Sequence, residues 1–318
     1  MTETITKRID KITHIPPERL MDLPPAPRSV KIELSGRCNY RCGFCALALR
    51  ETQPKEDMDL ALFKRITLEM RAAGVEEIGL FYIGESFINP QLLIDAILWL
   101  KVDAFGPHMP YVFLTSNASL ATPETVDACM AAGLDSLKWS INAADEKQFA
   151  EVMHVKPNVF HRALVNIAAA YRVRNDMGHR TRLYASSIKY DGDQGAKMQA
   201  MLDANVIPFV DEHYWLPLYS MGGQTDIGRK PTPGNTGRVD SPVAPLPCWA
   251  AFTEGHVLVD GQLSACCFDA SGRWIMGDLK TQSFMDAWHG APFQALRQAH
   301  LNRDVSGTEC ERCVLVGG

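Results

Sequence analysis

Six short β-rich runs alternate with longer helical runs between residues 28 and 211. The strand candidates are 29–34, 77–82, 111–115, 136–141, 182–187 and 207–210, and the helix candidates are 59–73, 89–102, 122–132, 145–153, 159–176 and 193–204. Alternation of this kind favours parallel βαβ units with right-handed crossovers. The pattern therefore predicts an α/β fold. If the sheet closes toward a barrel, functional groups gather at the C-terminal ends of its strands.

Three cysteines follow the first strand candidate at once. Cys38, Cys42 and Cys45 have the spacing Cys-x3-Cys-x2-Cys in a loop that also contains Gly and Arg. Three thiolates can hold three irons of a [4Fe–4S] cluster, which leaves the fourth iron open for a small ligand. A zinc site is the alternative, but zinc usually takes a fourth Cys or His, and none lies close in the sequence.

This segment closely resembles the signature of the radical S-adenosylmethionine (radical SAM) enzymes, including Phe44 before the third cysteine. In that family the open iron binds the amino and carboxylate groups of S-adenosylmethionine. An electron then cleaves it to a 5′-deoxyadenosyl radical, which takes a hydrogen atom from the substrate. The resemblance implies a partial (β/α)6 TIM-like barrel and an external one-electron reductant such as flavodoxin or ferredoxin.

The resemblance also implies contacts to S-adenosylmethionine at the ends of successive strands. Gly84 and Glu85 take the place of the family's Gly-Gly-Glu motif, in which the first Gly is Ile83 here. The family often has an Arg for the carboxylate; this chain offers Lys156 or a residue of the fifth strand instead. The full set of implied contacts is Phe44, Gly84, Glu85, Ser116, Asn117, Ser140 and Asn142. The alternative for each strand-end residue is an ordinary cap or turn.

A second group of cysteines lies near the C-terminus, at positions 248, 266, 310 and 313. A hairpin-like run over 256–266 has Asp260-Gly261 as its turn, and a helical segment over 283–302 precedes the last pair. Spacing alone does not separate zinc from iron–sulfur. The order of Cys248, Cys266, Cys310 and Cys313 resembles the twitch module, a shortened SPASM domain. That resemblance implies one auxiliary [4Fe–4S] cluster.

Two cysteines remain outside these groups. Cys129 lies on an amphipathic helix and is expected to be a packed core residue. Cys267 is adjacent to Cys266, so in a strand its side chain should point to the opposite face. It is either a buried thiol or a hydrogen-atom donor in the active site, as in radical SAM epimerases.

Composition restricts the functional class. The 318 residues carry a net charge of −5, which gives no electrostatic case for binding nucleic acid or an anionic membrane. No apolar run approaches the ~20 residues that span a bilayer, and the first residues do not form a signal peptide. Clustered cysteines without a secretion signal favour metal ligation in a reducing cytoplasm.

We expect four segments along the chain. These are an irregular N-terminal extension (1–27), the partial barrel (28–225), a Pro- and Gly-rich linker (226–247) and the auxiliary cluster module (248–318).

The leading functional hypothesis is dehydrogenation of a small-molecule carbinol, such as an aminoglycoside sugar or cyclitol, with electron transfer to the auxiliary cluster. The alternative is epimerisation of a sugar, an aminoglycoside or a peptide, with Cys267 returning the hydrogen atom. A non-catalytic iron–sulfur or zinc protein is the third class, and the three-cysteine site with Gly84-Glu85 speaks against it.

Overall fold

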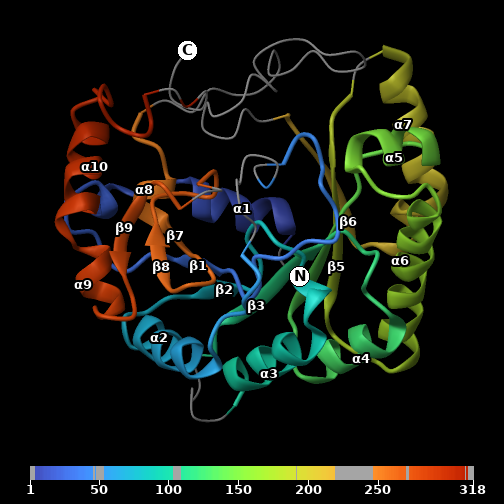
Figure 1. Cartoon of the computed structure of the whole chain (residues 1–318), viewed down its shortest axis with the longest axis horizontal. Helices are drawn as coiled ribbons and strands as arrows, with labels where there is room; N and C mark the ends of the chain where they lie inside the picture. The colour runs from blue at the N-terminus through green and yellow to red at the C-terminus, as the bar shows by residue number, and fades with distance from the viewer. Residues whose placement is uncertain are drawn as a thin grey trace.

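The computed structural model describes residues 4–45, 47, 54–102, 109–190, 192–218, 246–269, 272–311 and 313. Six parallel strands and three C-terminal strands form one nine-stranded sheet in the order β6-β5-β4-β3-β2-β1-β7-β8-β9. The sheet is curved, with most of the helices on its outer side (Figure 1). The expected parallel α/β fold is confirmed. The described part of the chain contains no helix of the length and hydropathy needed to cross a membrane.

The barrel elements alternate as the sequence predicts. Its strands are β1 Ser29–Ile32, β2 Glu77–Gly79, β3 Tyr111–Ser116, β4 Ser136–Ser140, β5 Arg182–Ile188 and β6 Glu212–Leu216. Its helices are α2 Leu60–Ala72, α3 Pro90–Leu100, α4 Pro123–Ala131, α5 Glu146–Met153, α6 Asn158–Asp176 and α7 Gly192–Asn205. Several begin at a side-chain cap; the Asp59 carboxylate, for example, accepts from the Leu62 N–H at the start of α2.

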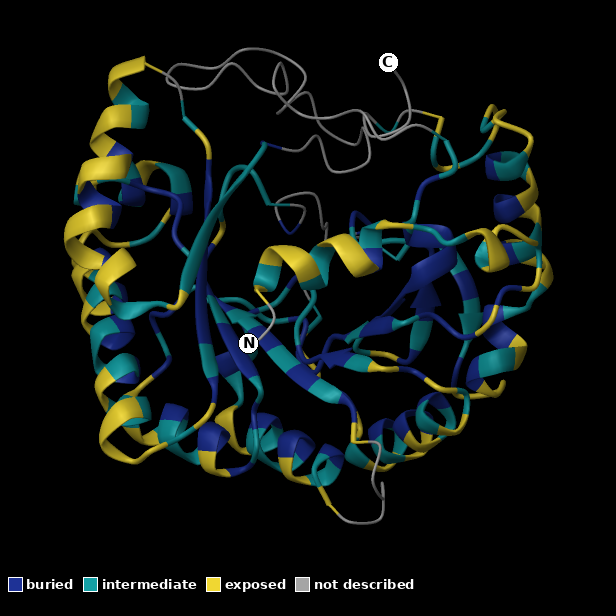
Figure 2. Ribbon diagram, turned by 180° about the vertical axis from the view of Figure 1, so that it is seen from behind, coloured by how far each residue is buried: buried dark blue, intermediate teal, exposed yellow. Residues whose placement is uncertain are grey.

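Strand β3 shows how the sheet separates its two faces. Val112 and Leu114 are fully buried, whereas Tyr111, Phe113 and Thr115 point to the opposite face and line a cavity inside the barrel. A period of two places alternate side chains on opposite faces. The buried face packs under the helices, whose exposed sides face solvent in Figure 2. Polar and aromatic side chains are therefore left for the barrel interior.

Three elements differ from the sequence predictions. The run over 207–210 is not the sixth strand, because Ile207–Phe209 forms a 3-10 helix containing Pro208 and the strand follows at Glu212–Leu216. The expected single helix over 283–302 is two helices, α9 Phe284–Trp288 and α10 Ala291–Leu301. Pro292, which has no N–H for a helical hydrogen bond, lies in the first turn of α10.

The third difference is at the N-terminus, where the extension is partly helical. Helix α1, Ile5–Thr13, crosses the strand starts. The Ile5 N–H donates to Glu212 over 2.9 Å, and the Arg8 guanidinium pairs with Glu77. Both acids are the first residues of their strands, so α1 covers the N-terminal end of the barrel interior.

The C-terminal module continues the barrel sheet. Strand β7, Glu254–Val257, pairs parallel with β1, and β8 Gln262–Ser264 and β9 Ile275–Asp278 follow antiparallel. The predicted β7–β8 hairpin is confirmed; Gly261 in its turn has φ +85°, which favours glycine. Most of the proposed linker (226–247) lies outside the described residues, as do residues 219–225 of the proposed barrel segment.

A buried arginine joins the module to the rest of the chain. Arg297, on α10, is fully buried and donates to the carbonyls of Ala251, Trp288 and Asp22 over 2.8–3.0 Å. Ala251 belongs to α8 Ala250–Thr253, directly after Cys248. The guanidinium therefore fixes the segment that carries the first cysteine of the module.

Replacing Arg297 by Met should leave these three carbonyls without donors. We expect the free energy of unfolding to fall by on the order of 3 kcal/mol, measured by urea unfolding of metal-free protein. The exposed Arg180 gives a matched control, and Arg180→Met should stay within about 0.5 kcal/mol of the wild type. Equal stability of the two variants would contradict the role given to Arg297.

Candidate functional site

The loop with the first three cysteines is held against the end of α5. The Gly43 N–H donates to the Val152 carbonyl over 2.9 Å. The Tyr40 ring packs edge-on against Phe149, with centroids 5.5 Å apart. The loop starts where β1 ends, so the three thiols lie at the C-terminal edge of the sheet, as predicted.

The thiols of this loop are desolvated. Burial raises the pKa of Cys38 to about 12 and that of Cys42 well above its usual value. The sulfurs of Cys38 and Cys45 accept backbone N–H groups of Tyr40 and Leu47, each over 3.4 Å. Metal ligation requires thiolates, and a bound cation supplies the charge that stabilises them. Without a bound cation, burial therefore keeps Cys38 and Cys42 as neutral thiols.

Gly84 is required by the close approach of two loops. A Cβ at this position would collide with the Ser35 carbonyl and lie 2.8 Å from that of Arg37. The Glu85 N–H donates to the same Arg37 carbonyl over 2.8 Å. Ile83, which replaces the family's first Gly, is buried against Leu47. The motif therefore packs directly on the cysteine loop.

The Glu85 carboxylate is buried and accepts three hydrogen bonds from the protein. Oε1 accepts from the Ser116 hydroxyl over 2.7 Å and the Phe87 N–H over 3.1 Å, and Oε2 accepts from the Asn117 N–H over 2.9 Å. Burial raises its pKa, and these donors oppose that shift. A carboxylate has about four acceptor positions, so one remains for the ammonium of S-adenosylmethionine. That contact stays a prediction, but the carboxylate also holds the end of β3.

Asn117 connects β3 to the cysteine loop through a ring of hydrogen bonds. Its Nδ2 donates to Oδ1 of Asn39 over 2.9 Å, and Asn39 Nδ2 donates to Ser119 Oγ over 2.8 Å. The Ser119 hydroxyl closes the ring by donating to Asn117 Oδ1 over 2.7 Å. Cys38, Glu85, Ser116 and Asn117 are therefore brought together as the sequence predicts.

At the end of β4, the side chains of Ser140 and Asn142 also form hydrogen bonds within the protein. Asn142 Nδ2 donates to Ser140 Oγ over 3.1 Å, and Asn142 Oδ1 accepts from the Ile188 N–H over 2.8 Å. Phe44 packs partly buried against the core, and the alternative carboxylate ligand Lys156 is exposed. Ser140, Asn142 and Phe44 remain predicted contacts to S-adenosylmethionine.

Two further buried hydroxyls lie in the barrel. Thr115 Oγ1 on β3 and Ser186 Oγ on β5 have no hydrogen-bond partner among the described protein atoms. A buried hydroxyl usually has a hydrogen-bond partner, so an ordered water or a polar ligand is expected beside each. Their signal in the sequence was weak, since each looks like an ordinary polar residue near a strand end.

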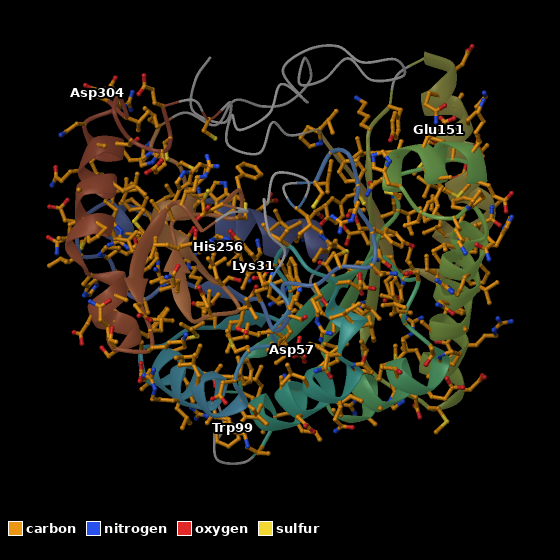
Figure 3. All side chains as sticks on the ribbon, viewed as in Figure 1. Lys31, Asp57, Trp99, Glu151, His256 and Asp304 are labelled. Atoms are coloured by element: carbon orange, nitrogen blue, oxygen red, sulfur yellow. The ribbon has the colours of Figure 1, made fainter. Side chains whose placement is uncertain are left out.

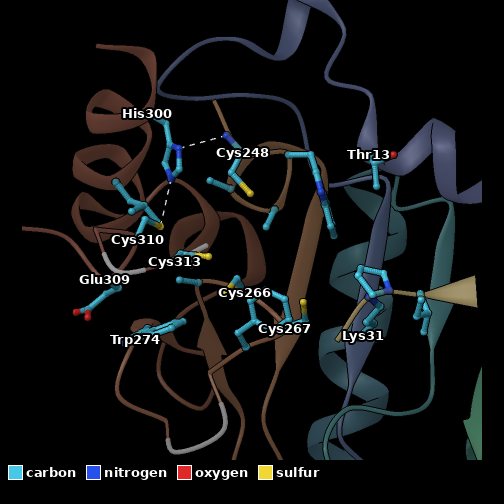
Figure 4. Close-up of a pocket in the computed structure, with 18 of the residues that line it drawn as sticks. Thr13, Lys31, Cys248, Cys266, Cys267, Trp274, His300, Glu309, Cys310 and Cys313 are labelled. Atoms are coloured by element: carbon cyan, nitrogen blue, oxygen red, sulfur yellow. Dashed lines mark hydrogen bonds between the residues drawn. The ribbon is translucent and has the colours of Figure 1, made fainter. Parts of the chain in front are cut away.

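The C-terminal cysteines converge on one cavity. It has a volume of about 670 Å³ and is lined by all five thiols of the module and by residues at the end of β6, including Trp215. Figure 4 shows the thiols of Cys248, Cys266, Cys310 and Cys313 together on one side. Burial raises the pKa of Cys248 to about 11 and of Cys310 to about 12. These grouped, desolvated thiols also fit a bound metal cluster.

Their spacing is wider than that of a zinc site. A Zn–S bond of about 2.3 Å in a tetrahedron places sulfurs ~3.8 Å apart. Within the described ranges, the set of His, Cys, Asp and Glu ligand atoms that lie within 4.8 Å of one another is Glu254, His256 and Cys267. The four grouped cysteines do not form such a set.

The loop that carries Cys266 is fixed by two polar side chains. The buried Asp269 accepts from the Ser264 hydroxyl over 2.8 Å and from the Trp274 N–H over 2.9 Å. The Tyr82 hydroxyl donates to the Cys266 carbonyl over 2.7 Å. Tyr82 directly precedes the Ile83-Gly84-Glu85 segment, so one stretch of chain after β2 contacts both cysteine groups.

A buried ion pair lies between the two sites. Lys31 Nζ on β1 is 2.7 Å from Glu254 Oε1 on β7, and His256 Nε2 is 2.8 Å from Glu254 Oε2. Lys31 and His256 lie close together in the middle of Figure 3. Burial tends to raise the pKa of Glu254, but Lys31 and His256 lower it to about 2. The ammonium of Lys31 already neutralises this carboxylate, so the group is an ion-pair network rather than a metal site.

Cys267 contacts this network instead of the other thiols. Its sulfur is within 4.8 Å of the Glu254 carboxylate and the His256 ring, and burial raises its pKa to about 12. Cys129, in contrast, is fully buried on α4 as a core residue, as predicted. One sign of the network is visible in the sequence, namely the charged Lys31 within an apolar strand, but its partners are not.

The hydrogen bonds of Glu85 lead to a stability test. An amide in Glu85→Gln cannot accept at both ends, so we expect unfolding free energy to fall by about 1–3 kcal/mol. Urea unfolding of metal-free protein measures this, and Glu151→Gln on the exposed side of α5 is the control. Unchanged stability with weakened S-adenosylmethionine binding would assign the carboxylate to the ligand alone.

Comparison with known families matches both halves of the chain. A model of the radical SAM superfamily matches residues 32–181, and a model of the SPASM iron–sulfur cluster-binding domain matches residues 248–314.

Two curated relatives are similar over part of the chain. An AdoMet-dependent heme synthase of Methanosarcina barkeri is 27% identical over 143 residues, covering 45% of this chain and 38% of the relative. A GTP 3′,8-cyclase of Chlorobaculum tepidum is 26% identical over 123 residues, covering 39% of this chain and 35% of the relative. The matches thus span little more than a third of these relatives.

Solved structures with a similar fold cover more of the chain. SuiB of Streptococcus suis bound to the precursor peptide SuiA has a TM-score of 0.67 at 14% identity, covering 98% of this chain and 72% of its own. BtrN in complex with AdoMet and 2-DOIA has a TM-score of 0.52 at 15% identity, covering 87% of this chain and 88% of the BtrN chain. At these identities the likeness shows the fold.

The two cysteine groups, one after β1 and one around β7 and β8 of the same sheet, fall in the two matched domains. The cofactors are S-adenosylmethionine and two [4Fe–4S] clusters. The chain belongs to the radical SAM superfamily and carries a C-terminal SPASM domain.

Proposed function

We propose that this radical SAM enzyme oxidises a carbinol of a small, hydroxyl-rich substrate, with the auxiliary cluster as electron acceptor. The observation that carries the proposal is the shared cavity. Its wall includes the auxiliary cysteines together with Lys31 of β1 and Trp215 and Leu216 of β6. A substrate in this cavity would therefore lie beside the acceptor. The volume of about 670 Å³ falls in the usual range for small-molecule sites, ~300–1,000 Å³.

The barrel interior offers groups that suit a hydroxyl-rich molecule. Thr115 and Ser186 supply hydroxyls without a described protein partner. Lys138 on β4 lies 3.2 Å from the Tyr214 hydroxyl on β6. Such donors and acceptors can replace the water around sugar hydroxyls, and aromatic walls exclude solvent.

The proposed reaction balances as a two-electron oxidation. When bound, S-adenosylmethionine and its cluster supply a carbon radical that takes one hydrogen atom, and the auxiliary cluster takes one electron. The hydroxyl proton goes to water or a basic group in the cavity. Cys38, Cys42 and Cys45 would hold the first cluster, and Cys248, Cys266, Cys310 and Cys313 the second.

Epimerisation is the second candidate, because Cys267 lines the same cavity. Its thiol is protonated at neutral pH, as a hydrogen-atom donor must be, since burial raises its pKa to about 12. Its contact with Glu254 and His256 equally suits a packed, inert thiol. We favour oxidation, which needs no hydrogen returned to the carbon.

The similar structures suggest which substrates to test first. BtrN holds 2-DOIA, whereas SuiB holds the SuiA peptide and anSMEcpe holds the Cp18Cys peptide. We therefore propose cyclitol and aminoglycoside compounds as the first panel and peptides as the second. Flavodoxin or ferredoxin is the proposed reductant.

Iron content tests the cluster assignment. Reconstituted protein should hold about eight irons per chain, and about four after Cys38, Cys42 and Cys45 are replaced by Ala. Iron and zinc analysis after anaerobic reconstitution measures both. About four irons with one zinc in the wild type would contradict the auxiliary cluster.

Cys267→Ala separates the two reactions. Under oxidation the variant still forms a product two hydrogens lighter, apart from modest packing losses. Under epimerisation it cleaves S-adenosylmethionine but fails to complete the inverted product. Mass spectrometry of the product formed in deuterated water distinguishes the two reactions. Cys129→Ala is the matched control for the loss of a buried thiol. One deuterium per product without mass loss, abolished in Cys267→Ala, would overturn the proposed oxidation.

A further inference from the structure

His300 contacts the auxiliary cysteines from α10 and is almost fully buried. Its Nδ1 accepts the backbone N–H of Cys248 over 3.2 Å, and its Nε2 lies 3.3 Å from the Cys310 sulfur. Both contacts are visible in Figure 4 as dashed lines. One imidazole thus joins the first and third cysteines of the module.

The first of these hydrogen bonds fixes the second. Nδ1 accepts from Cys248, so it carries no proton, and the proton of the neutral ring must be on Nε2. The Nε2–H then donates to the Cys310 sulfur. The tautomer follows from the geometry, because the backbone N–H of Cys248 can only donate.

The ring is held in this orientation by its surroundings. Phe252 of α8 packs edge-on against the imidazole, with ring centroids 6.4 Å apart. Arg297, one turn earlier on α10, fixes the neighbouring Ala251 carbonyl. The donor therefore cannot rotate away from Cys310 without breaking the contact to Cys248.

We propose that His300 is a positioning residue that raises the reduction potential of the auxiliary cluster through the Nε2–H to Cys310 hydrogen bond. A hydrogen bond to a ligand sulfur stabilises the more negative, reduced cluster. A buried donor has a larger effect than an exposed one because water does not screen it. The inference needs the auxiliary cluster but not the reaction proposed above.

The test is an EPR-monitored redox titration of the full-length, reconstituted protein. In His300→Phe the equilibrium constant for reduction of the auxiliary cluster should fall about tenfold. For one electron, this makes the midpoint potential about 59 mV more negative. His300→Gln, whose amide can both accept and donate, should lie between this value and the wild type. His289→Phe is the control, because His289 Nε2 contacts the Pro24 carbonyl and not a cysteine.

The auxiliary signal is identified as the one retained when Cys38, Cys42 and Cys45 are replaced by Ala. A wild-type potential in His300→Phe, with iron content unchanged, would overturn the proposal. If His300→Phe loses the cluster, pulsed EPR of wild-type protein with ¹⁵N-labelled histidine decides instead. A histidine ¹⁵N coupling that disappears in His300→Gln supports the hydrogen bond, and its absence from the wild type rejects it.

Discussion

The parallel pairing of β7 with β1 is the constraint on which the arrangement of both sites depends. It makes the C-terminal cysteine module an extension of the barrel sheet rather than a separate body. The Lys31–Glu254 ion pair forms between these two strands, with the Glu254 carboxylate buried and the Lys31 side chain mostly buried. Breaking such a pair on one side leaves an uncompensated buried charge. The same contact that joins the domains therefore also shapes the wall of their shared cavity.

The segment after β2 links the two cysteine groups at a finer scale. Tyr82 fixes the carbonyl of Cys266, whereas Gly84 and Glu85 pack on the loop of Cys38. Glu85 in turn holds the end of β3 through Ser116 and Asn117. A substitution in this segment should thus disturb stability and ligand binding together, as its hydrogen bonds serve both the fold and the site.

The sequence predicted what depends on local patterns. The βα alternation, the two cysteine motifs and the hairpin turn at Gly261 were all readable, since each is set by nearby residues. The sixth strand was misplaced because Ile207-Pro208-Phe209 is apolar, although Pro208 cannot donate to a ladder.

Contacts between distant segments could not be predicted. The Lys31–Glu254 pair and the hydrogen bond from the Cys248 N–H to His300 each join residues more than 50 positions apart, and no period or spacing in the sequence encodes them. The orphaned hydroxyls of Thr115 and Ser186 appear only once the strands are assembled. The contacts of Glu85 show the same limit, because a motif names the residue but not its protein partners.

In the proposed reaction, the cavity between the barrel and the C-terminal module lets the auxiliary cluster accept an electron from the substrate. The most direct measurement is a single turnover followed by rapid-freeze-quench EPR. It would use the carbinol compound that gives the highest yield of 5′-deoxyadenosine. The account predicts that one reduced auxiliary cluster appears for each 5′-deoxyadenosine formed, before the external reductant re-equilibrates. Product formation with the auxiliary cluster oxidised throughout would contradict it.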